Sequence, residues 1–307
     1  MVDLDTFVTT VYVLADDYCK AHEQCPAQPG RAPSLDMAEV ITLAMVSQWA
    51  PFGSERGFYR SAQQHLRPAF PTLPDRAQFN RLVRQQVGPI TRFALHLADG
   101  LCGSQVDFEI LDCTAVRTRN AKRRGHGWLV GWTAIGRSNR LGWYEGLKLL
   151  LAVTRSGVIR GFGAGTATAD DRALAETLFV VRERGDPRLP SVGRAATDIY
   201  VADGGFASYL RQILWREELD VCLLAPPQGT LNAWPKALKR RLVRLRQIIE
   251  TVNERLLFPF RLDAERPHEL TGFNARLAAK VALHNVCIWL NRSLGRPGLA
   301  IADLIDW

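Results

Sequence analysis

Apolar positions in the first hundred residues recur at the spacing expected of helices. In residues 3–22 they fall at every third or fourth position, and residues 34–50 repeat the pattern after an acidic first turn. Residues 75–103 continue it, with Pro89 at the joint between two helices. Because no strand-like alternation occurs here, residues 1–104 are predicted to form an all-helical N-terminal region.

From residue 105 onward the pattern changes to short apolar strands alternating with amphipathic helices. Three consecutive strands are followed by helix, strand, helix, strand and helix, which predicts an α/β fold: a mixed sheet flanked by helices over residues 105–307. Residues 117–143 form an insertion between the first two strands. The predicted strands cover 107–116, 144–157, 158–167, 197–206 and 220–227, and the predicted helices 170–185, 207–219, 236–258 and 272–294.

Two of these strands carry an aspartate at the predicted carboxyl end. Phe108, Ile110 and Asp112 alternate onto one face of the first strand, and Val201 and Asp203 do the same in the fourth. If the strands are neighbours, the carboxylates converge and repel each other unless a cation lies between them. Oxygen ligands of this kind suit Mg²⁺ or Mn²⁺. A lone strand-end aspartate is also a common turn or helix cap, which is the alternative interpretation.

A third carboxylate is expected from the helix over 236–258. At about 100° per residue its buried stripe consists of Leu242, Leu245, Ile249, Val252 and Leu256. Arg246, Glu250 and Asn253 lie along one flank of that stripe, whereas Glu254 lies farther round. Glu250 is therefore the preferred candidate ligand, and Arg246, one turn earlier, could hold its carboxylate or contact a phosphate.

The chain is basic, and its positive charge is clustered. It has 39 Lys and Arg against 31 Asp and Glu, a formal net charge of +8. One cluster flanks Asp112 and a second approaches Glu250; both suit DNA phosphates. A helix carrying Arg76, Arg81 and Arg84 suits a DNA backbone or a solvated surface equally well. The clustered bases are Arg117, Arg119, Lys122, Arg123 and Arg124 in the first group, and Lys236, Lys239, Arg240, Arg241, Arg244 and Arg246 in the second.

Other sequence features place the chain in the cytoplasm. The six cysteines are scattered without a CxxC pair, as expected of reduced core residues. Acidic residues interrupt the start of the chain, so no signal peptide is expected. No apolar run approaches the roughly 20 residues of a membrane helix, which predicts no membrane partner.

These residues together resemble the DDE transposases of bacterial insertion sequences, which have a ribonuclease-H-like catalytic core. The resemblance rests on Asp112, on Asp203 followed by Gly-Gly-Phe, and on Glu250 within RxxxE. Lys148 matches a family lysine on the second strand. The family signature YxxRxxxExxxxxxK is altered at two positions, where this chain has Val243 and Leu257, while the three acids are intact.

The resemblance implies a function, a cofactor and partners. Asp112 would bridge two Mg²⁺ or Mn²⁺ ions, and Asp203 and Glu250 would each complete one coordination sphere. The enzyme would cleave the ends of its element and join them to target DNA, with residues 1–104 as a DNA-binding region and residues 105–307 as the catalytic domain. Double-stranded DNA would be the partner, bound by a homodimer in the cytoplasm and, on DNA, at the bacterial nucleoid. Lys148 would join the basic clusters as a DNA contact.

Two other functions are compatible with the same residues. A metal-dependent nuclease of this fold would cut DNA without joining it, because a fold does not fix a function. A domesticated, non-catalytic DNA-binding protein would bind the ends and show no Mg²⁺-dependent cutting. A strand-transfer assay separates the first alternative from a transposase, and a cleavage assay separates the second.

Overall fold

The computed structural model describes residues 1–23, 33–49, 51–103, 106–123, 129–184, 197–227 and 234–306. The N-terminal region is helical, as predicted, and it also contains a short helix and a π-helical turn that the apolar pattern did not indicate. Its elements are α1 (Leu4–His22), α2 (Met37–Val46), α3 (Glu55–Ser61), the π-helical η1 (Ala62–Leu66), α4 (Arg76–Gln85) and α5 (Val87–Cys102).

Local capping explains where these helices begin. At α2 the Asp36 carboxylate accepts a hydrogen bond from the Glu39 amide over 2.7 Å, and the Glu39 carboxylate accepts one from the Asp36 amide over 2.8 Å. This reciprocal pair satisfies two amides that the helix itself leaves unpaired. Asp75 caps α4 in a similar way through the Gln78 amide, at 2.8 Å. Pro89 lies in the first turn of α5, where a missing amide hydrogen costs nothing.

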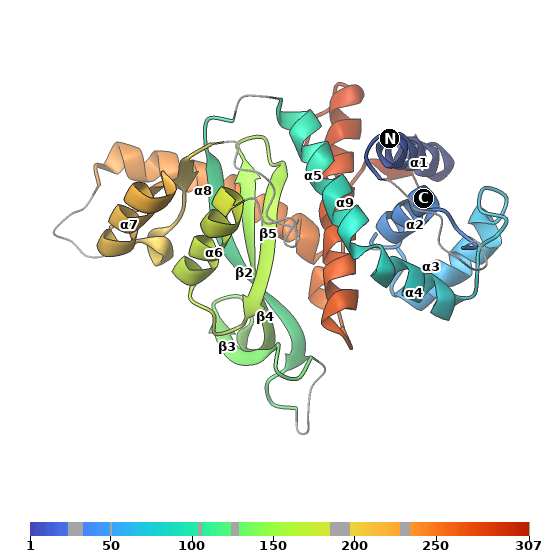
Figure 1. Ribbon diagram of the computed structural model, residues 1–307, viewed down its shortest axis with the longest axis horizontal. Helices are drawn as coiled ribbons and strands as arrows, with labels where there is room; N and C mark the ends of the chain where they lie inside the picture. Colours follow the sequence, from blue (N-terminus) through green and yellow to red (C-terminus); the bar gives the residue numbers. More distant parts are fainter. Residues whose placement is uncertain are drawn as a thin grey trace.

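The rest of the chain builds a six-stranded mixed sheet covered by helices (Figure 1). The strand order is β3-β4-β2-β6-β7, and β5 pairs with β4. Pairing is antiparallel among β2, β3, β4 and β5 and parallel between β2, β6 and β7. The elements are β2 (Glu109–Asn120), β3 (Ala134–Ser138), β4 (Gly142–Thr154), β5 (Ile159–Thr166), α6 (Asp171–Arg184), β6 (Ile199–Val201), η3 (Gly204–Phe206), α7 (Tyr209–Leu219), β7 (Cys222–Leu224), α8 (Lys236–Leu257), η4 (Leu262–Ala264) and α9 (Leu270–Ser293).

The first strand of the sheet is longer than its apolar pattern predicts. β2 runs on to Asn120, so Asp112 lies inside the strand and not at its tip. β2 loses one of its two neighbouring strands near this point. Its parallel pairing with β6 ends at Ile110, opposite Val201, whereas its antiparallel pairing with β4 continues to Asn120. The extra length places Arg117 and Arg119 on a paired strand, with a bulge between them.

The two faces of the sheet are buried in separate hydrophobic cores. Along β4, Leu149 and Leu151 pack into a core with α8 and α9, whereas Leu150 and Ala152 pack against α6 and α7. This alternation explains why β4 is apolar almost throughout, as expected for a central strand buried on both faces. In β2 the side chain of Ile110 is on the α8 side, so Asp112, two residues later, points to α8 as well.

A buried ion network fixes the start of β2. The Glu109 carboxylate lies 2.6 Å from Nη1 of Arg182 on α6 and 3.3 Å from Nε of Arg160 on β5. Arg182 also donates to the hydroxyl of Tyr200 on β6, over 2.9 Å. Buried charges are stable only when paired in this manner, so the network ties β2, β5, β6 and α6 together three residues before Asp112.

The N-terminal helices share one core with the sheet. Phe7 and Ile41 belong to the same cluster of buried residues as Ile249 on α8 and Ala278 on α9, and α9 packs against α2, α4 and α5 (Figure 1). No helix in the described ranges is long and apolar enough to span a membrane. A mixed sheet flanked by helices and preceded by a helical region is the ribonuclease-H-like fold that the sequence predicted.

Candidate active site

Asp112 and Asp203 occupy equivalent positions, each just beyond the paired residues of two parallel strands. The last paired residues of β2 and β6 are Ile110 and Val201. Asp112 follows two residues after Ile110, and Asp203 follows two residues after Val201. Asp203 lies just beyond β6, where its Oδ1 accepts a hydrogen bond of 2.8 Å from the Gly205 amide at the start of η3. The strand arrangement therefore brings together two acids separated by 91 positions in the sequence.

Glu250 reaches the same place from α8, and Arg246 joins the acids. Nη2 of Arg246 lies 3.7 Å from Oδ2 of Asp203 and 3.5 Å from Oε1 of Glu250. The buried stripe of α8 is close to the predicted one, and it turns the flank carrying Arg246 and Glu250 toward the sheet. Glu254 lies exposed farther round the helix. One guanidinium thus contacts acids from two different elements.

Asn253 is a site residue to which the sequence analysis gave no role. It is buried on α8, and its Nδ2 donates a hydrogen bond of 2.9 Å to Oδ2 of Asp112. Its own Oδ1 is buried and has no hydrogen-bond partner. The sequence feature that could have indicated a role for Asn253 is its position three residues after Glu250, one turn along the same flank of the helix.

Burial and neighbouring charges make Asp112 unusual among the three acids. Burial raises the pKa of Asp112 to about 7; the Arg246 guanidinium works against this, and the Asp203 and Glu250 carboxylates add to it. Both acids therefore lie close enough to Asp112 for their charges to act on its ionisation. A strongly shifted carboxyl beside a charge partner is typical of a functional site.

The oxygens at this site suit a hard divalent ion. Among the described residues, no three His, Cys, Asp or Glu side chains are arranged to hold a metal as they stand, and the positive charge beside Asp203 and Glu250 is that of Arg246. The donor set nevertheless consists of three carboxylates and the unpartnered amide oxygen of Asn253. Mg²⁺ and Mn²⁺ prefer oxygen donors of these types, so the residues fit such an ion.

Lys148 lies on the other face of the sheet from Asp112. On β4 it alternates with Leu147 and Leu149, so it points toward α6. Its Nζ donates to the Ala169 carbonyl over 2.6 Å and pairs with Asp171 over 2.8 Å. The structure therefore brings Asp112, Asp203, Glu250 and Arg246 together but does not place Lys148 beside Asp112.

The predicted basic clusters differ in how far their charges are paired. Arg117 lies 3.9 Å from Asp263, and Arg119 lies 3.7 Å from Glu145. Arg124 falls outside the described residues. The side chains that are exposed on the surface are Lys122 and Arg123 after β2, and Lys236, Lys239, Arg240, Arg241 and Arg244 on α8.

Comparison with known proteins identifies the family of this chain. The sequence profile of the family described as "Transposase DDE domain" matches residues 108–286, which include Asp112, Asp203 and Glu250. Searches of curated proteins and of solved structures found no match. A ribonuclease-H-like core with three gathered acids defines the class of DDE enzymes. Since the family profile covers more than half of its length, this chain belongs to the DDE transposase family, whose members act on DNA.

Proposed function

We propose that this protein is a transposase that cleaves the ends of an insertion sequence and joins them to target DNA. The observation that supports this most directly is that Arg246 pairs with both Asp203, just after β6, and Glu250 on α8, while the charges of all three act on Asp112 in β2. Cleavage and joining are both in-line displacements at phosphorus, so one site can perform both.

The three acids would hold two Mg²⁺ or Mn²⁺ ions, with Asp112 shared between them. Bound divalent ions lower the pKa of an attacking water or DNA 3′-hydroxyl and stabilise the leaving oxygen. Asn253 orients the Asp112 carboxylate by its hydrogen bond. Asp112 is partly buried, and its reduced exposure to water strengthens electrostatic interactions at its carboxylate.

Double-stranded DNA is the proposed partner, both as element ends and as target. The exposed Lys122, Arg123, Lys239, Arg240 and Arg244 suit contacts to its phosphates, which add affinity without reading sequence. From the resemblance we also propose a homodimer on paired DNA ends, acting in the cytoplasm at the nucleoid.

A cleavage assay on the coding region with its flanking DNA tests the catalytic assignment. Asp112→Ala should bind the flanks as the wild-type protein does and should lose Mg²⁺-dependent strand cleavage. Asp107→Asn is the matched control, because Asp107 is an exposed acid just before the same strand. Unchanged cleavage by Asp112→Ala refutes the assignment.

A strand-transfer assay on the same DNA distinguishes the alternatives. Joining of cleaved ends to a second duplex is expected of a transposase. Cutting without joining indicates a nuclease of the same fold. Binding without any Mg²⁺-dependent cutting indicates a domesticated DNA-binding protein.

A further inference from the structure

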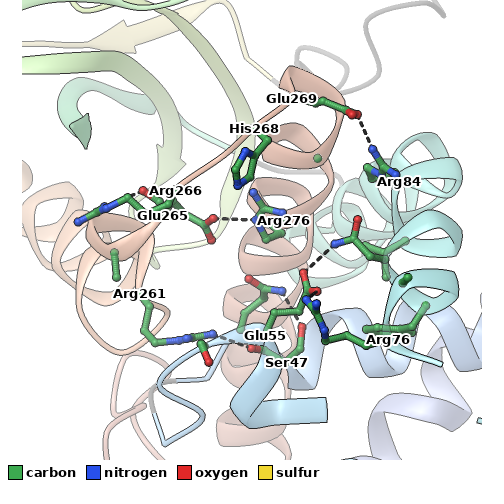
Figure 2. Close-up of a pocket in the computed structure, with 18 of the residues that line it drawn as sticks. Ser47, Glu55, Arg76, Arg84, Arg261, Glu265, Arg266, His268, Glu269 and Arg276 are labelled. Carbon is green, nitrogen blue, oxygen red and sulfur yellow. Dashed lines mark hydrogen bonds and ion pairs between the residues drawn. The ribbon is translucent and has the colours of Figure 1, made fainter. Parts of the chain in front are cut away.

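An arginine-rich cleft of about 600 Å³ opens between the N-terminal helices and the segment that follows α8 (Figure 2). One wall comes from α4 and from the loop between α2 and α3. The other comes from η4 and the residues leading into α9, with Arg276 on α9 between the walls. We call this cavity the arginine cleft. None of the proposed catalytic acids lines it; its arginines are Arg76, Arg81, Arg84, Arg261, Arg266 and Arg276.

Positive charge in the arginine cleft exceeds negative charge by three. Three glutamates line it beside the six arginines. Each glutamate pairs with one arginine: Glu55 with Arg76 at 3.3 Å, Glu265 with Arg276 at 2.7 Å, and Glu269 with Arg84. Among the described residues, no carboxylate lies within ion-pair distance of the other three arginines, which are Arg81, Arg261 and Arg266.

Neutral acceptors hold these three guanidinium groups in place without cancelling their charge. Arg81 donates twice to Oε1 of Gln78, at 3.0 and 2.7 Å. Arg261 donates to the Ser47 carbonyl at 2.9 Å, and Arg266 to the Glu265 carbonyl at 2.7 Å. Each guanidinium has five N–H donors, so several remain for a ligand, and the buried Nε of Arg261 has no partner.

Buried contacts tie together the elements around the arginine cleft. The Lys280 side chain is 0% exposed; it lies 2.8 Å from Oε1 of Glu265 and donates to Oε1 of Gln48 over 2.6 Å. These contacts join α9, the segment after α8 and the end of α2. A buried network of hydrogen bonds and ion pairs of this kind restrains the segments that carry the arginines.

The chemistry of the lining favours a phosphodiester backbone as ligand. Guanidinium forks match phosphate oxygens in bidentate geometry. The three arginines with excess charge come from α4, from the turn after α8 and from the segment before α9, so they suit a chain of phosphates better than a single one. Among the described lining residues the only phenyl or indole ring, Phe79, is buried, which leaves no such ring to stack on a base.

We propose that the arginine cleft binds the sugar–phosphate backbone of double-stranded DNA through Arg81, Arg261 and Arg266, independently of base sequence. This inference rests on the proposed function, because it assigns a second contact to the same DNA. Under this proposal, DNA contacts the junction between the N-terminal helical region and the segment that follows α8.

The salt dependence of DNA binding tests this proposal. Binding of a short labelled duplex of arbitrary sequence is measured by fluorescence anisotropy in EDTA, so that cleavage does not interfere, over a range of KCl concentrations. Each phosphate contact contributes about 0.9 to the slope of log K against log salt. The double variant Arg81→Ala/Arg266→Ala should therefore bind more weakly to every duplex, with a slope shallower by about 2. Both residues are exposed, so the thermal unfolding midpoint should not change.

Two further variants make the test specific. Arg81→Lys/Arg266→Lys keeps the charge and should keep most of the slope. Arg216→Ala removes one charge from α7, which lies at the other end of the molecule from α4 (Figure 1), and should leave the slope as in the wild-type protein. A slope in the double alanine variant equal to that of the wild-type protein overturns the proposal, as does a loss that Arg216→Ala reproduces.

The outcome is separable from that of the catalytic proposal. Asp112→Ala should bind the labelled duplex with the wild-type slope. Cleavage by Asp112→Ala would refute the catalytic site and leave the salt slope of the arginine cleft unaffected. An unchanged slope in Arg81→Ala/Arg266→Ala would refute the cleft and leave the cleavage result unaffected.

Discussion

Asn253 and Asp112, 141 positions apart in the sequence, are joined by a hydrogen bond of 2.9 Å from Nδ2 to Oδ2. The bond links Asp112, the acid of the proposed triad whose pKa is raised by burial, to the helix that carries Glu250. It restrains the orientation of the Asp112 carboxylate. Outer partners of this type orient a metal-binding carboxylate and tune its affinity.

Asn253→Ala should therefore lower the rate of Mg²⁺-dependent cleavage by about 10- to 100-fold. The loss should shrink when the Mg²⁺ concentration is raised, because a less well-oriented carboxylate weakens ion binding before it affects chemistry. Rates are measured by single-turnover cleavage at several Mg²⁺ concentrations. Glu254→Gln is the control on the exposed side of α8 and should cleave normally. A normal rate in Asn253→Ala would show that the hydrogen bond has no role in positioning.

Arg246→Gln should make the protein more dependent on divalent ions for its stability. In the wild-type protein the guanidinium offsets the repulsion between Asp203 and Glu250. Both pairs are partly exposed, so the loss in the metal-free variant should be no more than about 1 kcal/mol for each. Thermal unfolding with and without Mg²⁺ checks this: the rise in midpoint on adding Mg²⁺ should be larger in the variant. An equal rise in both proteins contradicts the prediction.

Glu265 and Glu269 form ion pairs beside the same cleft but should contribute very differently to stability. Glu265 is 10% exposed and faces the fully buried Lys280, whereas Glu269 is 62% exposed. Glu265→Gln leaves a buried ammonium without its counter-ion and should cost about 3–5 kcal/mol of unfolding free energy. Glu269→Gln should cost no more than about 1 kcal/mol. Urea unfolding of both variants is the measurement, and equal losses would contradict the burial argument.

The contribution of Glu265 should vanish in acid. Burial alone would raise its pKa, but Lys280 and Arg276 outweigh burial and hold the pKa of Glu265 at about 2, below its ordinary value of 4.5. A carboxyl with a lowered folded-state pKa stabilises the protein fully above its unfolded-state pKa and loses this effect as pH falls. The stability difference between wild type and Glu265→Gln should therefore shrink as the pH falls from about 4.5 to 2. A difference that does not change with pH would contradict the assignment.

Gly146 is required by the close approach of β2 and β4. A Cβ at this position would lie 2.1 Å from the Val116 carbonyl oxygen, closer than atoms can approach. Gly146→Ala should thus push the strands apart near Arg117 and cost about 1–3 kcal/mol, as overpacking does. Gly163→Ala on β5 is the matched control, since a Cβ there would meet nothing within 4 Å. Chemical denaturation of the two variants tests the contrast, which fails if both lose the same stability.

The strands and helices around the sheet were predictable because they follow from local periodicity. Strand alternation placed Asp112 with Ile110, and helical periodicity placed Glu250 on the flank of the α8 stripe. Parallel neighbours then bring Asp112 and Asp203 together without knowledge of any side-chain contact. The family resemblance supplied the order of these elements.

The features that escaped prediction depend on partners far away in the sequence. The second half of β2 is polar and basic, so it has the composition of a loop, and only pairing with β4 makes it a strand. Lys148 was predicted as a DNA contact from the motif, and its ion pair with Asp171 on α6 depends on packing that the motif does not contain. The role of Asn253 requires the packing of α8 on β2, which no local pattern contains.

The parallel pairing of β1 (Val2–Asp3) with β8 (Ile305–Asp306) brings the two ends of the described chain together (Figure 1). Together with the shared core, this pairing ties α1 to the region that carries the proposed catalytic acids. Replacing the first hundred residues with those of another protein would remove part of that core, so the two regions depend on each other for stability.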